Sequence, residues 1–269
     1  MPIDPEKNSA LLKGKSAAVA CSPEKSEKLL RGLQEMGAAV VPLAVIAIRE
    51  TEDKGALDSV LSRLGTYSWI IFTSSYAAQF FTLRAKERGR MEELSELRNI
   101  CAVGPATAAT LRKLGIQVSL LPEEFVAEGV LRALADRHGG LHKLAHTHIL
   151  LPRAKEARDV LPRELVAAGA EVEIVTCYET IAGEISPQIL CTLRARLPDL
   201  LVFTSSSSVR NFMNILGKEE GTRFLDGAVV AALGPVTAGT VESFGKSPEV
   251  VPRESTIPAL LHAIRDFFA

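Results

Sequence analysis

The sequence predicts an α/β protein of two similar domains, each with a parallel sheet flanked by helices. Three observations support this. Short apolar runs alternate with segments of helical spacing, as expected for parallel strands covered on both faces. A pair of motifs occurs twice at matched intervals. The 269 residues also suffice for two domains of about 130 residues.

The expected strands follow one another along the whole chain. They are residues 16–21, 38–41, 69–72, 100–103, 118–120, 149–151, 172–175, 200–203, 229–233 and 250–251. Helical segments fall between most of them. Residues 24–36, for example, carry Leu29, Leu33 and Met36 at helical spacing, and Gly37 follows, where a helix commonly stops.

An internal repeat organises these elements. WIIFTSS at 69–75 resembles LLVFTSS at 200–206, and GPAT at 104–107 corresponds to GPVT at 234–237. The stretch 18–43 likewise parallels 150–175, with Gly37 and Gly169 at an offset of 132 residues. The chain therefore contains two copies of one α/β unit. The repeat leaves open whether each copy folds on itself or the copies exchange halves.

Composition excludes several classes of protein. Lys and Arg number 31 against 32 Asp and Glu, which argues against a nucleic-acid binder. The longest apolar run, 40–48, contains Pro42 and is far shorter than the ~20 residues that span a bilayer. Residues 1–9 are polar and carry no targeting pattern. We expect a cytoplasmic protein without membrane or nucleic-acid partners.

The four cysteines are scattered along the chain, at positions 21, 101, 177 and 191. No CxxC pair occurs, so we expect small core residues in a reducing compartment. His138, His142, His146 and His148 crowd into one region. Gly139 and Gly140 weaken a helix there and HExxH is missing, so a polar loop before a strand is favoured over a zinc site.

Hydroxyl-rich loops follow two of the strands. They are Thr73, Ser74 and Ser75, and Thr204, Ser205 and Ser206. Capping of the next helix explains one hydroxyl in each loop. Several in a row favour anion binding, because helix amides and dipole ends lie at the carboxyl edge of such a sheet.

Gly104 and Gly234 mark two further strand-to-helix turns. Each is followed by Pro, which suits the first helical position. Thr107 and Thr237 lie inside the first turn of each helix. A well-built turn explains Gly and Pro, whereas the two threonines also point to the predicted anion site.

Cationic and aromatic candidates for the predicted site lie in and just after the stretch 150–175. Arg153 and Lys155 are expected in the turn after strand 149–151, where a surface role and carboxylate binding are both open. Arg158 and Arg163 are expected to be solvated helix residues. Tyr178, expected just past strand 172–175, is either a packed aromatic or a proton donor. GxGxxG, the P-loop and GxSxG are missing, which disfavours a nucleotide-dependent transferase or a catalytic triad.

Taken together, these motifs resemble the uroporphyrinogen-III synthase family, from about residue 14 to residue 268. The family shows a strand running into a Thr-Ser loop, then Val-Gly-x-x-Thr-Ala, and both again in the second half. The matching segments are FTSS at 72–75, VGPATA at 103–108, FTSS at 203–206, LGPVTA at 233–238 and the connector YET at 178–180.

The resemblance implies domains with exchanged halves. Residues 1–43 would join 183–269 in one domain, and 51–175 would form the other. The connectors 44–50 and 176–182 would run antiparallel as a flexible two-stranded ladder.

The resemblance also implies a reaction. The enzymes of this family are lyases that close linear hydroxymethylbilane into uroporphyrinogen III for tetrapyrrole biosynthesis, with loss of water and inversion of ring D. No cofactor or metal is used. Tyr178 matches the connector tyrosine and would be the catalytic acid. Thr107 and Thr237 match cleft threonines, and the serines at 74, 75, 205 and 206 match substrate-facing loops. We expect a monomer that receives its substrate from hydroxymethylbilane synthase.

One departure from the family pattern concerns the end of the first strand. Arg-Pro is common there, whereas this chain has Cys21, Ser22 and Pro23, so one cationic contact is missing. A catalytically degenerate two-lobed module that binds anions or tetrapyrroles therefore stays an alternative, because a fold alone does not fix a function.

Overall fold

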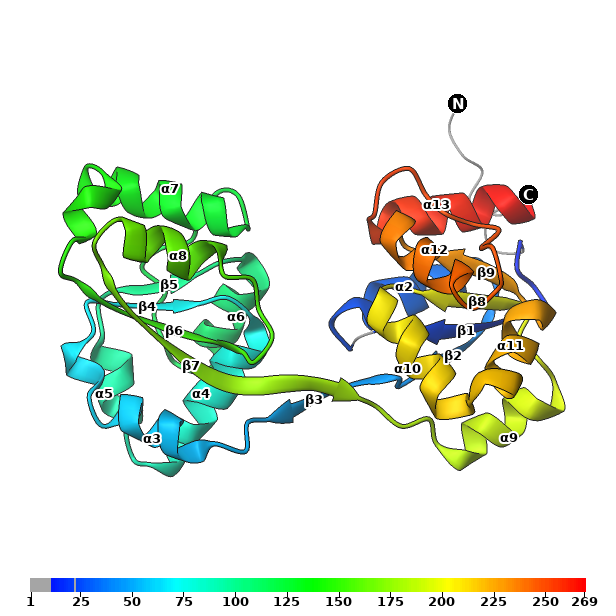
Figure 1. Ribbon diagram of the computed structural model, residues 1–269, viewed down its shortest axis with the longest axis horizontal. Helices are drawn as coiled ribbons and strands as arrows, with labels where there is room; N and C mark the ends of the chain where they lie inside the picture. Colours follow the sequence, from blue (N-terminus) through cyan, green and yellow to red (C-terminus); the bar gives the residue numbers. More distant parts are fainter. Residues whose placement is uncertain (1–10, 22) are drawn as a thin grey trace. The chain divides into compact units, whose positions relative to one another are not determined.

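A computed structural model describes residues 11–21 and 23–269 of the chain (Figure 1). Its contacts divide the chain into unit 1, Met1–Ala47 with Ile181–Ala269, and unit 2, Ile48–Thr180. The expected connectors 44–50 and 176–182 are shared between the two units. Ser22, where the family pattern was expected to depart, lies outside the described residues.

Unit 1 is built on a four-stranded sheet in the order β2-β1-β8-β9. Its strands are β1 (Ser16–Ala20), β2 (Ala39–Leu43), β8 (Leu200–Phe203) and β9 (Val229–Ala232). All three pairings are parallel, with Ala18 opposite both Val41 and Leu201. Every residue of β8 is buried, as expected of a central strand covered on both faces.

Helices cover both faces of this sheet. One face packs against α2 (Pro23–Glu35) and α13 (Ile257–Phe268) through Leu29, Leu33 and Leu260. The other face packs against four helices around Phe203 and Phe212. These are α9 (Pro187–Ala195), α10 (Ser206–Leu216), α11 (Lys218–Gly227) and α12 (Pro235–Glu242).

Unit 2 repeats the plan around a five-stranded sheet in the order β3-β7-β6-β4-β5. The strands are β3 (Ile46–Glu50), β4 (Trp69–Phe72), β5 (Ile100–Ala102), β6 (His148–Ala154) and β7 (Glu171–Ala182). The pairs β4–β5, β4–β6 and β6–β7 are parallel. Together the two units confirm the predicted fold class.

The helices of unit 2 also form two layers. On one face lie α3 (Lys54–Leu61), η1 (Leu64–Thr66), α4 (Ser75–Glu87), α5 (Met91–Glu96) and α6 (Pro105–Lys113). On the other lie α7 (Ala127–His138), η2 (Leu141–Leu144) and α8 (Val160–Ala167). Among residues 11–21 and 23–269, no helix has the length and apolarity needed to cross a membrane.

Some expected strands differ from the observed ones. Segments 118–120 and 250–251 form only isolated bridges, Cys101 with Leu120 and Ala231 with Val250. Pro122 and Pro252 follow shortly after, and a proline has no N–H for a further ladder bond. In contrast, β6 and β7 run longer than 149–151 and 172–175. Arg153 therefore lies inside a strand and not in the predicted turn, and Tyr178 lies inside β7 and not just past its end.

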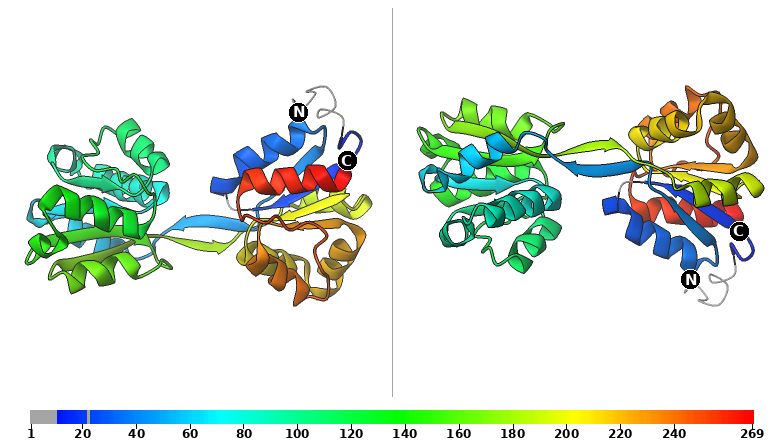
Figure 2. Two further views of the ribbon diagram at one scale, coloured as in Figure 1. Left: turned by 90° about the horizontal axis from the view of Figure 1, so that it is seen from above. Right: turned by 90° about the horizontal axis from the view of Figure 1, so that it is seen from below.

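The two connecting segments lie side by side. β3 leads from unit 1 to unit 2, β7 leads back, and they are neighbours in the sheet (Figure 2). Near the unit 1 end, the Gly183 amide donates to the Val45 carbonyl at 3.0 Å. Near the unit 2 end, the Thr51 amide donates to the Cys177 carbonyl at 3.0 Å.

Candidate functional site

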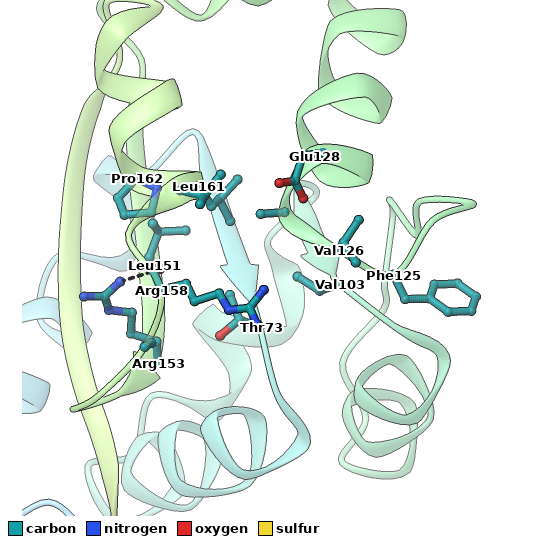
Figure 3. A pocket seen from close by; sticks show the side chains of 13 residues that line it. Thr73, Val103, Phe125, Val126, Glu128, Leu151, Arg153, Arg158, Leu161 and Pro162 are labelled. Atoms are coloured by element: carbon teal, nitrogen blue, oxygen red, sulfur yellow. Dashed lines mark hydrogen bonds between the residues drawn. The ribbon is translucent and has the colours of Figure 1, made fainter. Parts of the chain in front are cut away.

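The carboxyl edge of the unit 2 sheet holds a pocket of about 290 Å³. Thr73 follows β4, Val103 follows β5, and Leu151 and Arg153 belong to β6. The segment before and into α7 and the segment 157–162 complete the lining (Figure 3). This is the edge at which open α/β sheets bind ligands. Its lining residues are Thr73, Val103, Phe125, Val126, Ala127, Glu128, Leu151, Arg153, Ala157, Arg158, Val160, Leu161 and Pro162.

Helix N-termini converge on this edge. α4 begins at Ser75 behind Ser74, whose Oγ accepts the Ala77 amide at 3.1 Å. α6 begins behind Gly104, and α8 begins with Val160, which lines the pocket. The unpaired amides and dipoles of such termini favour anions. The sequence therefore placed Thr73, Ser74, Ser75 and Gly104 correctly at helix starts.

Arg158 is the cation that the sequence prediction missed. It was expected on a helix, but α8 starts only at Val160, so Arg158 lies in the preceding loop and lines the pocket. Figure 3 shows its guanidinium directed into the pocket beside Thr73. A guanidinium here can bind a carboxylate in a bidentate manner. The signal that could have placed it is Pro162, which suits the first turn of a helix.

Arg153 is held by the protein itself. Its Nη2 lies 2.8 Å from Asp159 Oδ1 and its Nη1 donates to the Arg158 carbonyl at 3.2 Å. The side chain is only 12% exposed. Arg153 lines the pocket, but two of its nitrogens are already engaged, which the sequence pattern could not show.

Lys155 belongs to a different surface. Its side chain is 64% exposed and lies 3.5 Å from Glu179 Oε2. It lines a separate hollow of about 450 Å³ with Thr51 and Asp53. The structure therefore separates Lys155 from Thr73 and Arg153, although all three were expected to bind the substrate.

A β-bulge determines where Tyr178 lies. Arg153 pairs with Thr176 and Ala154 with Tyr178, so Cys177 is the extra residue. A bulge re-aims side chains, and the consecutive residues Cys177 and Tyr178 are both buried. The Tyr178 hydroxyl donates to Ser74 Oγ at 3.0 Å. The structure thus brings two predicted site residues into contact.

The Tyr178 ring is also packed against other aromatic rings. Tyr76 and Phe80 of α4 lie with their ring centroids 5.7 and 6.2 Å from it, and only 8% of Tyr178 is exposed. The structure confirms the packed aromatic of the two expected roles and shows that the ring packing and the hydroxyl contact with Ser74 occur together. On the same face, Thr107 is 5% exposed within α6.

In unit 1 the two serine hydroxyls of the equivalent loop are engaged in hydrogen bonds within the protein. Ser205 and Ser208 form a reciprocal capping box at the start of α10. Ser206 Oγ donates to the Val236 carbonyl at 3.1 Å and accepts from Thr240 at 2.8 Å. Thr204 is 3% exposed, and its Oγ1 has no hydrogen-bond partner. The capping interpretation therefore accounts for Ser205, and Ser206 joins α10 to α12.

Gly234 begins α12 in an extended conformation with φ −172°. A Cβ at this position would lie 2.1 Å from Ser255 Oγ, so the Ser255 side chain would have to move. The equivalent Gly104 has room, since a Cβ would lie 3.6 Å from Phe125 Cβ. Thr237, like Thr107, is buried in the first turn of its helix. The two copies of the turn are therefore alike in backbone and different in surroundings.

Most of the cysteines are buried, and His138 accepts a hydrogen bond inside unit 2. Cys21, Cys101 and Cys177 are buried as predicted, but Cys191 is exposed, because it lies on the outer side of α9 away from Leu193. Burial raises the pKa of the Cys101 thiol to about 12. Trp69 Nε1 donates to His138 Nε2 at 3.2 Å. Within the described part of the chain, no three His, Cys, Asp or Glu residues are grouped to hold a metal ion.

Sequence comparisons relate the whole chain to known proteins. A family described as "Uroporphyrinogen-III synthase HemD" matches residues 27–262. The uroporphyrinogen-III synthase of Synechococcus elongatus is 26% identical over 260 residues, covering 94% of this chain and 96% of the relative. That of Chlorobaculum parvum is 25% identical over 256 residues, covering 94% and 98%.

Solved structures share the fold. The uroporphyrinogen-III synthetase from Helicobacter pylori aligns with a TM-score of 0.61 at 17% identity, covering 94% of this chain and 99% of that one. A mutant uroporphyrinogen III synthase from Thermus thermophilus aligns with a TM-score of 0.52 at 16% identity, covering 94% and 98%.

Proposed function

The chain belongs to the uroporphyrinogen-III synthase family, an enzyme family of tetrapyrrole synthesis, and from this premise we propose that it converts hydroxymethylbilane into uroporphyrinogen III. The reaction would make the protein a lyase, because the linear substrate loses water as the ring closes. The observation that carries the proposal is the convergence of Thr73, Arg158 and the N-termini of α7 and α8 on one pocket.

This pocket suits a carboxylate side chain of the substrate. The Arg158 guanidinium supplies a full positive charge, and Thr73 lies beside it (Figure 3). The Val103, Val126 and Leu161 side chains supply apolar walls, against which a pyrrole ring can pack. Few cations are needed because helix amides bind anions without charged side chains. This agrees with a net charge of −1.

We assign proton transfer to Tyr178. Protonation of the terminal hydroxymethyl group lets the C–O bond break and water leave, which produces a cationic azafulvene end. The substituted α-carbon of ring D then attacks this end and gives a spiro intermediate. The bond from that carbon to the methylene bridge of ring C breaks, and the free α-carbon of ring D bonds to the same methylene and loses its proton, which closes the ring with ring D inverted. Tyr178 is a candidate acid because its hydroxyl reaches the strand-end loop, where it lies 3.0 Å from Ser74 Oγ. Holding the chain in the folded conformation is the larger part of catalysis.

Unit 1 would bind substrate carboxylates mainly through backbone groups. Ser205 and Ser206 hydroxyls are engaged within the unit, so we assign binding there to the amides at the starts of α10 and α12. Thr204 and Gly234 directly precede these starts. In unit 2 we assign the same carboxylate binding to the amides at the starts of α4 and α6, which Ser75 and Gly104 mark. Thr107 and Thr237 lie inside the first turns of α6 and α12 and support those turns.

The decisive experiment supplies hydroxymethylbilane and resolves uroporphyrinogen I from uroporphyrinogen III. We expect isomer III to form faster than the spontaneous formation of isomer I. Isomer I alone, at the rate seen without protein, would contradict the proposal. Binding of hydroxymethylbilane without formation of isomer III would favour the degenerate two-lobed module.

We further propose that the protein acts as a monomer and receives hydroxymethylbilane from hydroxymethylbilane synthase. The open-chain substrate closes spontaneously to the wrong isomer, so a short transfer path favours the correct product. Light scattering after size exclusion tests the mass expected of one 28.9 kDa chain. A coupled assay with increasing dilution tests the transfer.

A further inference from the structure

The Arg153 guanidinium contacts the loop that carries Arg158. Residues 155–159 connect the end of β6 to the start of α8. At the start of this loop the Lys155 amide donates to the Tyr178 carbonyl at 2.8 Å. At its end, Arg153 holds Arg158 through the backbone carbonyl and Asp159 through the carboxylate, at 3.2 and 2.8 Å.

The position of the two Arg153 contacts matters because the pocket-lining segment that leads into α8 lies at the same place. Arg158, whose own carbonyl is bonded to Arg153, lines the pocket, and so do Val160, Leu161 and Pro162, which follow it closely in sequence. Fixing the Arg158 carbonyl and the Asp159 side chain restricts the backbone that directly follows the Arg158 Cα. An arginine side chain loses considerable rotamer freedom on binding, and a fixed backbone reduces that cost.

Stability alone is a poor explanation of this arrangement. The Arg153 side chain is 12% exposed, whereas its partner Asp159 is 75% exposed, so the pair joins a buried cation to a solvated anion. In addition, Arg153 Nε is buried without a hydrogen-bond partner. Burial of a charged donor without full pairing costs free energy. Imperfectly paired groups of this kind are typical of places where geometry is maintained for function.

We propose that Arg153 is a positioning residue that acts through Arg158: it fixes the 155–159 loop so that the Arg158 guanidinium faces the pocket. This replaces the sequence-based expectation that Arg153 itself binds the substrate carboxylate. The inference rests on the proposed function, because the carboxylate that Arg158 meets belongs to the substrate proposed above.

A double-mutant cycle tests the proposal. Arg153→Met keeps the aliphatic length and removes the guanidinium, and Arg158→Gln removes the pocket cation. We expect Arg153→Met to raise KM for hydroxymethylbilane about tenfold with a much smaller change in kcat. The double variant should be no worse than Arg158→Gln alone, since residues that act as one unit are not additive. Fully additive effects would overturn the proposal, because they would show that Arg153 contacts the substrate independently.

Arg84→Met is the matched control. Arg84 is 14% exposed, belongs to the same unit and pairs with Asp58 at 2.7 Å, but it does not line the pocket. We expect Arg84→Met to lower Tm while KM stays unchanged. An equal rise of KM in both variants would show a general loss of stability and overturn the positioning role. Asp159→Asn removes the loop carboxylate that pairs with Arg153 and should therefore also raise KM, as Arg153→Met does.

Hydrogen exchange supplies a test without activity. In the otherwise folded Arg153→Met protein, amides of 155–159 should exchange faster than in the wild type, while those of β4 and β8 stay protected. Unchanged exchange in the loop would overturn the proposal. If the wild type forms no isomer III, the proposed function fails, and the exchange result alone decides whether Arg153 orders the loop.

Discussion

At the scale of single residues, side chains that looked equivalent in the sequence have different partners in the structure. Arg153 and Arg158 lie five positions apart, yet one is held by the loop and the other faces the pocket. Ser74 accepts a bond from Tyr178, whereas its repeat equivalent Ser205 is paired with Ser208. The chemistry therefore differs between the two copies even where the residue type is the same.

Replacement of Tyr178 by Phe tests its role as an acid. The change removes the hydroxyl that donates to Ser74 and keeps the ring packed against Tyr76 and Phe80. We expect turnover of hydroxymethylbilane to fall roughly tenfold to a hundredfold without vanishing, since positioning still operates. Full turnover would rule out the acid role. Tyr67→Phe is the control, because the Tyr67 hydroxyl donates to Glu173 and not to the strand-end loop.

Asp199 gives a pH-dependent test of unit 1. The Ser16 amide donates to Asp199 Oδ2 at 2.8 Å, and this hydrogen bond lowers the carboxyl pKa below its ordinary value of 3.8. The unfolded chain then binds the proton more readily than the folded one. The stabilisation is therefore fully present above that ordinary pKa and is lost as the pH falls through the lowered value.

We therefore expect Asp199→Asn to lower the urea midpoint at pH 7, with a difference from wild type that shrinks below pH 4. The control is Asp226→Asn, which changes an exposed carboxylate of α11. A difference that stayed constant with pH would show that the loss does not come from the Asp199 charge.

At the scale of elements, the two copies of the repeat have the same strand-to-helix turn but differ in whether its glycine can carry a Cβ. The Gly234→Ala change places a Cβ 2.1 Å from Ser255 Oγ, whereas the Gly104→Ala change gives an ordinary 3.6 Å contact. We expect Gly234→Ala to destabilise the protein by about 1–3 kcal/mol and Gly104→Ala to have little effect in chemical denaturation. Ser255→Gly in the same chain should restore stability, and failure to do so would mean that the clash is elsewhere.

Elements were predictable from sequence where apolar runs are uninterrupted. Strands 69–72 and 200–203 have the predicted bounds because their residues are all buried. The bulge at Cys177 was not predictable, since it depends on pairing with β6 and leaves no local signature. The start of α8 was also placed wrongly, and Arg158 was consequently assigned to a helix. The Thr-Ser loops were recognised, but which hydroxyls are engaged depends on neighbours distant in sequence, such as Tyr178 and Thr240.

At the scale of the whole molecule, the chain passes between the units twice. Gly183 lies where the returning strand meets the outgoing one, and a Cβ there would be 1.9 Å from the Ala44 carbonyl oxygen. Because that oxygen belongs to the backbone, it cannot move aside cheaply. We expect Gly183→Ala to destabilise unit 1 by about 2 kcal/mol or more.

The only tryptophan of the sequence makes this measurable, because Trp69 belongs to unit 2. Circular dichroism should show a lowered transition for unit 1, while Trp69 fluorescence should report an unchanged transition for unit 2. A shift of the fluorescence transition by the same amount would show that the two units unfold as one.

The pairing of β1 with β8 also has a consequence during synthesis of the chain on the ribosome. β1 is paired on one side with β2, but its other partner begins only at Leu200, which emerges roughly 10–40 s later at ordinary translation rates. All of unit 2 is synthesised within that interval. The nascent chain therefore carries an apolar strand pair without its third strand while the later unit is already able to fold, so unit 1 completes its sheet after unit 2.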